Sequence, residues 1–355
     1  GELQPVGCVV LYDDTRTAVC SNFVARMQLA DGMNSSFWRY FHAAAYAARL
    51  NVRSIKQTSG IQNLDQQQYL DEIAGFPPFP EQTAIAAFLD RETAKIDALV
   101  EEQRRLIELL KEKRQAVISH AVTKGLNPDV PLKPSGIDWL GDVPEHWEVG
   151  VLKRYWSVTD CKHVTPEFLD TGIPLASIRE VQSRWVRLED AKCTTEHFYA
   201  LLSEGDRKPM AGDLIFSRNA TVGEVAQVPL DPPQFCMGQD VCLLRKLTSD
   251  CSSDYLQYVL KSPIVGQQLA QVMIGSTFKR VNVEEIRSLV VPSPPPAEQA
   301  AIAKFLEVEV DCNDALTAEA ERAIDLLQER RTALISAAVT GKIDVRTLAA
   351  QAEAA

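Results

Sequence analysis

Apolar positions in two stretches of the chain recur at steps of three and four residues, as on one face of a long helix. In the first stretch the apolar positions are Ile96, Leu99, Leu106, Leu110 and Val117, and in the second they are Leu316, Ala320, Ala323, Leu327 and Leu334. This pattern predicts two amphipathic helices, at residues 81–125 and 298–341. Each helix is too long to be buried by one small domain. We therefore expect the two helices to pack on each other as an antiparallel coiled coil.

Outside these helices the pattern is that of mixed strands and helices. Short apolar runs at residues 9–12 and 23–24 predict strands, and an aromatic stretch at 37–50 predicts a helix. Prolines predict a non-helical connector at 76–80. Further strands are expected at 214–216, 241–244 and 289–291, and a helix at 255–272. The prediction is an α+β fold with domains at 1–80 and 140–297, a linker at 126–139 and a flexible tail at 342–355.

One block of the sequence occurs twice. Residues 81–123 match residues 298–340 at a constant offset of 217, and 24 of the 43 positions are identical. Upstream at the same offset, Trp38 matches Tyr255 and the proline pair 77–78 matches 294–295. The second copy opens near Leu140, so its counterpart would lie about 80 residues before Gly1. We expect two domain–helix units, of which the first lacks the N-terminal half of its domain.

Composition restricts the chemistry. No apolar run reaches the length of a membrane span. The eight cysteines include no C-x-x-C pair, which favours reduced thiols and a cytoplasmic location. The net charge of −11 is unlike that of a protein that grips duplex DNA with a basic face. If the chain binds DNA, the positive charge must be local, or a partner must supply it.

Several segments, in this order, resemble the specificity (S) subunit of type I restriction–modification enzymes. The segments are residues 139–147 (WLGDVPEHW), 212–223 (GDLIFSRNATVG), 275–282 and 294–306, the last of which is repeated at 77–89. The resemblance covers nearly the whole chain. It implies two mixed α/β target-recognition domains, the first truncated, that are separated by the two long helices.

DNA reading needs cationic or amide side chains that reach phosphates and base edges from a turn or a strand edge. Three groups have this character, although a single surface cation is more often simply solvated. The candidate DNA-binding residues are Arg218, Asn219 and Thr221 in a turn, Thr277, Lys279, Arg280 and Asn282 in a second cluster, and Arg179, Arg184 and Arg187 on a possible strand. We expect Trp147, Trp156 and Trp185 to be core residues rather than platforms for stacked bases.

Motifs for catalysis are absent from the sequence. It contains no G-x-x-x-x-G-K-[ST] loop, and its five histidines include no pair at i and i+4. Residues 231–234 (DPPQ) are similar to a methyltransferase loop, but Gln234 cannot stack on a flipped base as an aromatic ring would. We therefore expect no cofactor and no metal, and a stand-alone methyltransferase or nuclease is the least favoured alternative.

The resemblance implies a non-catalytic subunit that reads one half of a bipartite target in double-stranded DNA through residues 140–296. Its implied partners are type I methyltransferase (modification) subunits, docked on the helix pair, and through them the restriction/translocase subunit. The helix pair would set the spacer between the half-sites. The alternative is a scaffold or decoy that binds modification subunits without reading DNA, and the acidic charge favours this alternative.

Overall fold

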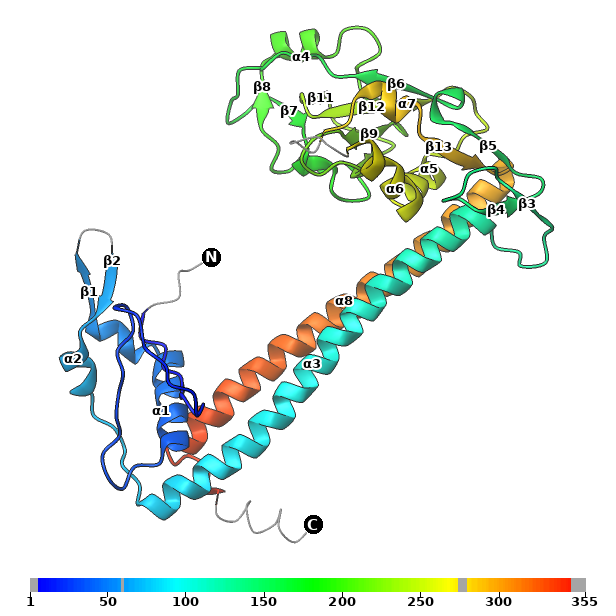
Figure 1. The fold of residues 1–355 in the computed structure, drawn as a ribbon. Coiled ribbons are helices and arrows are strands. Elements are labelled where there is room, and N and C mark those ends of the chain that lie inside the picture. Colours follow the sequence, from blue (N-terminus) through cyan, green and yellow to red (C-terminus); the bar gives the residue numbers. More distant parts are fainter. Residues whose placement is uncertain (1–5, 59–60, 274–279, 346–355) are drawn as a thin grey trace. The chain divides into compact units, whose positions relative to one another are not determined.

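The computed structural model describes residues 6–58, 61–273 and 280–345. It is an α+β structure with small β-sheets and two long helices, α3 (Phe79–Lys124) and α8 (Pro296–Val339) (Figure 1). The residues form two compact units, Gly1–Glu108 with Thr317–Ala355, and Leu109–Leu316. Each long helix contributes one part to each unit. None of the described helices is both long and apolar enough to cross a membrane.

The two long helices begin two residues before the predicted positions. The connector predicted at 76–80 was wrong at its end, because Phe79 and Pro80 already lie in α3. Pro296 likewise begins α8. Proline is tolerated in the first helical turn, where its missing N–H has no helical acceptor to lose.

The first unit packs three helices around one apolar core. Helix α1 (Ser35–Ala47) is capped by the Asn34 side chain, which accepts from the N–H of Phe37 at 3.0 Å. A 3-10 helix (Leu50–Ser54), a hairpin of β1 (Ile55–Thr58) and β2 (Ile61–Leu64), and α2 (Gln66–Leu70) follow. Phe37 and Leu89 are fully buried in the core that α1 shares with α3 and α8.

The strands predicted at 9–12 and 23–24 were wrong. The described residues 6–34 contain neither helix nor strand, and Val10 and Phe23 are 82% and 81% exposed. A strand needs a neighbour to pair its backbone groups. In the described part of this unit the only strands are β1 and β2, which pair with each other.

The second unit is built on a four-stranded antiparallel sheet in the order β10-β9-β12-β6. Its strands are β6 (Trp156–Asp160), β9 (Leu214–Ser217), β10 (Val225–Gln227) and β12 (Val241–Lys246). Every residue of β9 and the first four of β12 are buried. Burial on both faces explains why these strands were recognisable as continuous apolar runs rather than as alternating patterns.

Smaller elements surround this sheet. A three-stranded sheet has the order β11-β7-β8, and two further strand pairs are β13 with β5 and β3 with β4. Their bounds are β3 Leu132–Pro134, β4 Asp142–Pro144, β5 Glu148–Val151, β7 Ile173–Ala176, β8 Cys193–Thr194, β11 Cys236–Met237 and β13 Val290–Ser293. The short helices are α4 Glu196–Leu202, α5 Ser253–Leu260, α6 Pro263–Val272 and α7 Val283–Arg287.

Two element predictions in this unit were wrong. The single helix expected at 255–272 is broken into α5 and α6, because α5 ends at Leu260 and Pro263, which is favoured at the first position of a helix, begins α6. The strand suggested for Arg179 to Arg187 is a 3-10 helix (Arg179–Val181) followed by irregular backbone. Only Trp185 forms an isolated bridge there, with Gln227.

Within each unit the two long helices run antiparallel. In the first unit, Arg331 of α8 donates to Asp97 of α3 at 2.8 Å. In the second unit, Arg114 of α3 pairs with Asp314 of α8 at 3.3 Å. Asp97 and Asp314 are equivalent at the repeat offset of 217, and so are Arg114 and Arg331. The two ion pairs are therefore equivalent contacts in the two copies of the repeat.

A buried glutamine gives each unit the same local structure. Gln82 and Gln299 are equivalent in the repeat, and each accepts at 2.8 Å from the backbone N–H of a helix N-cap residue, Asn34 of α1 or Ser252 of α5. Each also donates to a proline carbonyl, Pro77 at 2.9 Å or Pro294 at 2.8 Å. The sequence repeat is therefore a structural repeat at the start of both long helices.

The predicted apolar stripe on the helices was wrong by one residue at several positions. Leu99 and Leu106 are 44% and 42% exposed, whereas Val100 and Ile107 are 7% and 8% exposed. In α8, Leu316 is 47% exposed, while the predicted Ala320 is indeed buried. The side that faces the partner helix is set by packing, which the spacing alone does not determine.

Candidate nucleic-acid interface

Three strands of the second unit bring polar residues to one edge of the four-stranded sheet. Strand β6 ends at Asp160, β9 ends at Ser217 and β12 begins at Val241, and the strand registers pair Asp160 with Cys242 and Ser217 with Val241. We call this region the β6–β9–β12 edge. It comprises Asp160, residues 217–221, residues 239–241 and Arg280.

Arg218 lies inside this edge rather than on its surface. Its side chain is 3% exposed, and its guanidinium pairs with the Asp160 carboxylate at 2.8 Å. The Arg218 N–H donates to the Asp240 carbonyl at 2.8 Å, and the Arg218 carbonyl accepts from the Val281 N–H at 3.0 Å. One residue thus joins the end of β6, the end of β9, the start of β12 and the segment that leads to α7.

Asn219, Thr221 and Arg280 lie close to Arg218 along the backbone or through backbone pairing, and they are more exposed than Arg218. Asn219 is half-buried, donates its amide to the Asp240 carboxylate at 2.9 Å and forms an antiparallel bridge with Arg280. Thr221 is exposed, and its hydroxyl lies 3.3 Å from that of Ser217. Arg280 is exposed. The structure therefore brings these three predicted residues together.

The other members of the second predicted cluster have different positions. Asn282 is the N-cap of α7, and its backbone N–H donates to the Glu285 carboxylate at 2.6 Å. This is the reciprocal contact of a capping box. Thr277 and Lys279 lie outside the described residues.

Two of the three arginines predicted on a strand are held by carboxylates. Arg179 pairs with the buried Glu180 at 3.1 Å and donates to the Asp190 carbonyl at 2.8 Å. Arg184 pairs with Glu307 of α8 at 2.8 Å and with Asp254 of α5 at 3.4 Å. Lys304 and Arg184 hold the pKa of the Glu307 carboxyl below its usual value.

Arg187 and Trp185 face solvent. The Arg187 side chain is exposed, and its backbone N–H donates to the Glu180 carbonyl at 3.1 Å. Trp147 and Trp156 are buried as predicted, but the core prediction for Trp185 was wrong, since Trp185 is 40% exposed. The Arg184 guanidinium lies 5.3 Å from the centre of the Trp185 ring. This stacking lets the indole ring remain at the surface.

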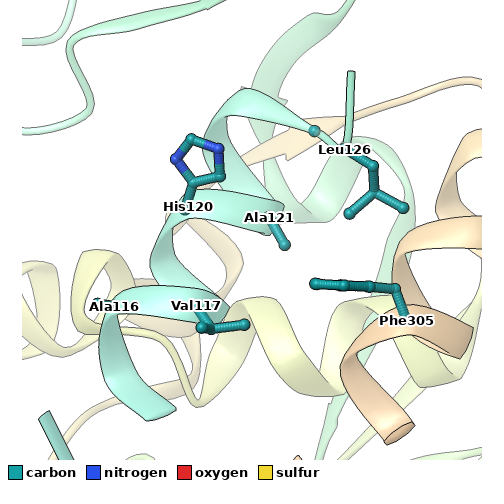
Figure 2. Close-up of a pocket in the computed structure, with 7 residues that line it drawn as sticks. Ala116, Val117, His120, Ala121, Leu126 and Phe305 are labelled. Atoms are coloured by element: carbon teal, nitrogen blue, oxygen red, sulfur yellow. The ribbon is translucent and has the colours of Figure 1, made fainter. Parts of the chain in front are cut away.

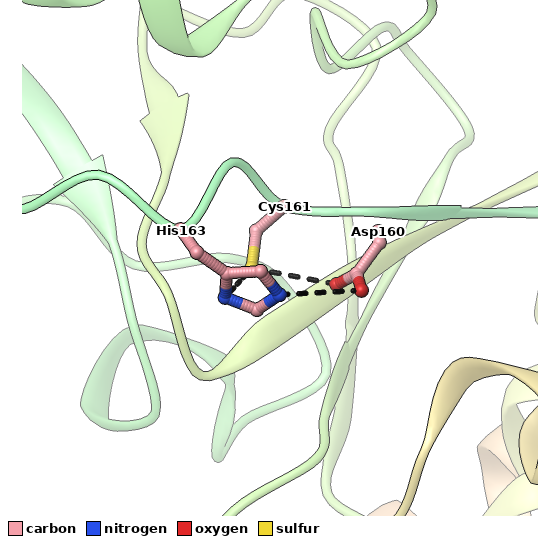
Figure 3. A group of neighbouring side chains, drawn as sticks. All are labelled: Asp160, Cys161 and His163. Carbon is pink, nitrogen blue, oxygen red and sulfur yellow. Dashed lines mark hydrogen bonds and ion pairs between the residues drawn. The ribbon is translucent and has the colours of Figure 1, made fainter.

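Asp160, Cys161 and His163 form a cluster that the sequence analysis missed (Figure 3). Their ligand atoms all lie within 4.8 Å of one another, as metal ligands can. The sequence analysis looked for two histidines at i and i+4, and this cluster has one histidine in the order D-C-x-H, so it was not detected. The buried Cys161 thiol donates to the Gln239 carbonyl at 3.0 Å, and burial raises its pKa to about 11.

The chemistry of this cluster does not favour a resident metal. A metal ion would need the Cys161 thiolate. It would also stand beside the Arg218 guanidinium, which lies 3.6 Å from the Cys161 sulfur and already neutralises Asp160. The Arg218 guanidinium therefore supplies the positive charge beside Asp160 that a metal ion would otherwise supply.

An apolar hollow lies at the end of α3 in the same unit (Figure 2). Phe305 and Leu126, which are 40% and 41% exposed, face it. Phe88 is equivalent to Phe305 in the repeat but is buried in the first unit. The hollow is lined by Ala116, Val117, His120, Ala121, Gly125, Leu126 and Phe305.

Comparison with known proteins gives a consistent result. A family model described as the type I restriction modification DNA specificity domain matches residues 199–324. The MjaVIII specificity subunit of Methanocaldococcus jannaschii is 23% identical over 303 residues, which cover 84% of this chain and 68% of that protein. The EcoKI specificity subunit of Escherichia coli is 24% identical over 306 residues, which cover 83% of this chain and 63% of that protein.

A solved structure has a similar fold. It comes from work on the complex assembly and conformational transition of the type I R-M system. One of its chains matches this chain with a TM-score of 0.58 at 18% identity. The match covers 86% of this chain and 70% of that chain. This chain thus spans about two thirds of the length of the proteins that it resembles.

Proposed function

Because this chain belongs to the family of type I restriction–modification specificity subunits, we propose that it reads one half of a bipartite DNA target through residues 140–296. The chain is a recognition subunit and not an enzyme. Methyl transfer and cleavage belong to its partner subunits in this proposal.

The observation that carries the proposal is the polar surface of the β6–β9–β12 edge. Asn219 and Thr221 lie in the turn after a buried strand, and the exposed Arg280 is bridged to Asn219. An asparagine amide can pair with adenine, and a guanidinium can bind guanine or a phosphate. Side chains fixed at strand ends can present these groups in a constant geometry.

The predicted DNA-binding residues divide by their surroundings. Asn219, Thr221, Arg280 and the exposed Arg187 are proposed to contact DNA, together with Thr277 and Lys279. Arg179, Arg184 and Arg218 are each engaged by a carboxylate. In our proposal these three arginines hold the domain together, and Asn282 caps α7.

Partner subunits complete the proposed complex. A chain with a net charge of −11 lacks the overall positive charge that dominates DNA affinity. We propose that modification subunits bind the long helices and supply much of this charge. The apolar hollow beside Phe305 is a candidate contact, because exposed apolar surface of this kind favours a protein partner.

Selection from a randomised duplex tests the proposal. The chain is reconstituted with the modification subunits of its own system, the complex is retarded in a gel, and the bound DNA is sequenced. Enrichment of a defined half-site that depends on residues 140–296 is expected. Binding that is tight but blind to sequence would instead identify a scaffold.

A further inference from the structure

Arg218 is in the right place to contact DNA but its guanidinium is not accessible. At the end of a strand in the β6–β9–β12 edge, an arginine that contacts DNA would be expected to face solvent. The Arg218 side chain is instead 3% exposed, and its charge is directed at Asp160, whose side chain is 35% exposed. A guanidinium that is buried and paired in this way cannot insert into a groove without breaking the pair.

The contacts of Arg218 connect segments that are far apart in the sequence. The guanidinium links β9 to Asp160, at the end of β6, 58 residues earlier. The backbone of Arg218 links β9 to Asp240 on one side and to Val281 on the other. A single residue therefore ties four segments of the second unit together.

The exposed polar residues of the edge depend on these links. Asn219 follows Arg218 directly, and its amide is aimed by the carboxylate of Asp240, whose carbonyl accepts from Arg218. Arg280 is bridged to Asn219 and precedes Val281, whose N–H donates to Arg218. A shift of Arg218 would therefore displace both Asn219 and Arg280.

We propose that Arg218 is a positioning residue for DNA recognition: held by Asp160, it fixes Asn219 and Arg280 in the geometry that reads bases and does not itself contact DNA. This inference rests on the proposed function. Recognition geometry tolerates errors of only about 0.5 Å, so a loosened support is enough to weaken base discrimination.

Asp160→Asn is the decisive variant, because it leaves Arg218 in place and removes the charge that holds it. The affinity of the reconstituted complex is measured for its selected duplex and for a scrambled duplex, over a series of salt concentrations. We expect affinity for the selected duplex to fall by about 10- to 100-fold, equivalent to one or two weakened base contacts. Affinity for the scrambled duplex and the salt dependence should not change.

Arg218→Lys and the double variant separate positioning from contact. Lysine keeps the charge but loses the fork that grips Asp160, so Arg218→Lys should also relax base choice. The double variant should be no worse than either single variant, since all three break one link. If Arg218 binds a phosphate, Arg218→Lys or Asp160→Asn would change binding to both duplexes, and an Arg218→Met variant would lower the salt slope by about one. That result would overturn the proposal.

A second ion pair of the same domain supplies the matched control. Arg245 of β12 pairs with the buried Asp213 at 2.6 Å, away from the β6–β9–β12 edge. Asp213→Asn should destabilise the domain while leaving base choice intact. Equal relaxation of base choice by Asp213→Asn and Asp160→Asn would mean a general loss of stability, and the positioning role would be rejected.

Hydrogen exchange without DNA keeps this inference distinct from the proposed function. In Asp160→Asn, the amides of residues 217–221 and 280–282 should exchange faster, with no comparable change in β5 or β13. Unchanged exchange would overturn the positioning role even if the chain reads DNA. The two experiments can also give different answers. If Asp160→Asn speeds exchange but the complex with the unchanged chain selects no DNA sequence, Arg218 still holds residues 217–221 and 280–282 in place, and the proposed function is rejected.

Discussion

Four arginines of the second unit differ in their surroundings, since two are held by carboxylates and two face solvent. Arg184 and Arg218 belong to the first group, and Arg187 and Arg280 to the second. The sequence analysis proposed all four as DNA-binding candidates, in three separate groups, because cations near turns look alike in a linear pattern. The partner that distinguishes Arg218 is Asp160, and contacts between residues so far apart in the sequence leave no local signal.

Arg280→Ala tests the proposed base contact at this scale. Removing a guanidinium that binds a base should cost about 1–3 kcal/mol of binding free energy and relax selection at one position. The measurement is sequencing of bound duplexes from a randomised pool. Arg154→Ala, which removes another exposed arginine of the same unit, is the control and should leave selection unchanged. Equal effects of the two variants would contradict the assignment.

The cysteines provide a prediction with a pH dependence. Burial, aided by the neighbouring Asp160 charge, raises the pKa of the Cys161 thiol to about 11, and Cys312 is exposed on α8. The thiolate is the reactive form, so Cys161 should resist alkylation at pH 8 and react only as the pH approaches 11. Peptide mapping after iodoacetamide treatment should find the exposed Cys312 modified before Cys161. Comparable rates at pH 8 would contradict the burial of Cys161.

Helix boundaries were predictable within two residues because proline and apolar spacing mark them locally. The side of each long helix that faces the other long helix was less predictable. Leu109 and Leu110 are chemically identical neighbours in α3, but Leu109 is 52% exposed and Leu110 is 7% exposed. Only the packing of the antiparallel partner within each unit determines which of the two is buried.

Leu110→Ala should therefore destabilise the protein far more than Leu109→Ala. A buried leucine truncated to alanine costs about 2–5 kcal/mol, from lost transfer free energy and the cavity that remains. The exposed neighbour should cost less than about 1 kcal/mol. Urea unfolding followed by circular dichroism gives the two values. A difference of less than 1 kcal/mol would show that the helix faces are assigned incorrectly.

The duplicated glutamines make a prediction about the repeat. Gln299→Met keeps the side-chain length but leaves the Ser252 N–H and two carbonyls without their partner. We expect a loss of about 1–3 kcal/mol in unfolding free energy for the buried groups left unpaired. Gln82→Met should cause a loss of similar size in the first unit, whereas the exposed Gln328→Met should have little effect. Differential scanning calorimetry of the three variants is the measurement.

For the whole molecule, the repeat was the feature most visible in the sequence. The domain boundaries were harder to predict, because the compact unit Leu109–Leu316 extends well beyond the domain expected at 140–297. Ile118 and Val122 of α3, with Ile302 and Leu306 of α8, belong to the core of that unit. Helix ends that serve as core residues cannot be separated from the domain by composition.

Charge gives a prediction for the complex as a whole. The chain carries a net charge of −11, so we expect it to bind scrambled duplex weakly by itself. Adding the modification subunits should strengthen binding and steepen its salt dependence. Fluorescence anisotropy over a salt series measures both quantities. Tight, salt-sensitive binding by the chain alone would contradict the proposed division of charge between the subunits.

Exchange of the recognition domain is the most direct test of the central claim. Residues 140–295 are replaced by the matching segment of the EcoKI specificity subunit, and the duplexes selected by the reconstituted complex are sequenced. The account predicts that the enriched half-site changes to one that the donor segment selects. An unchanged half-site in a folded, assembled complex would contradict it.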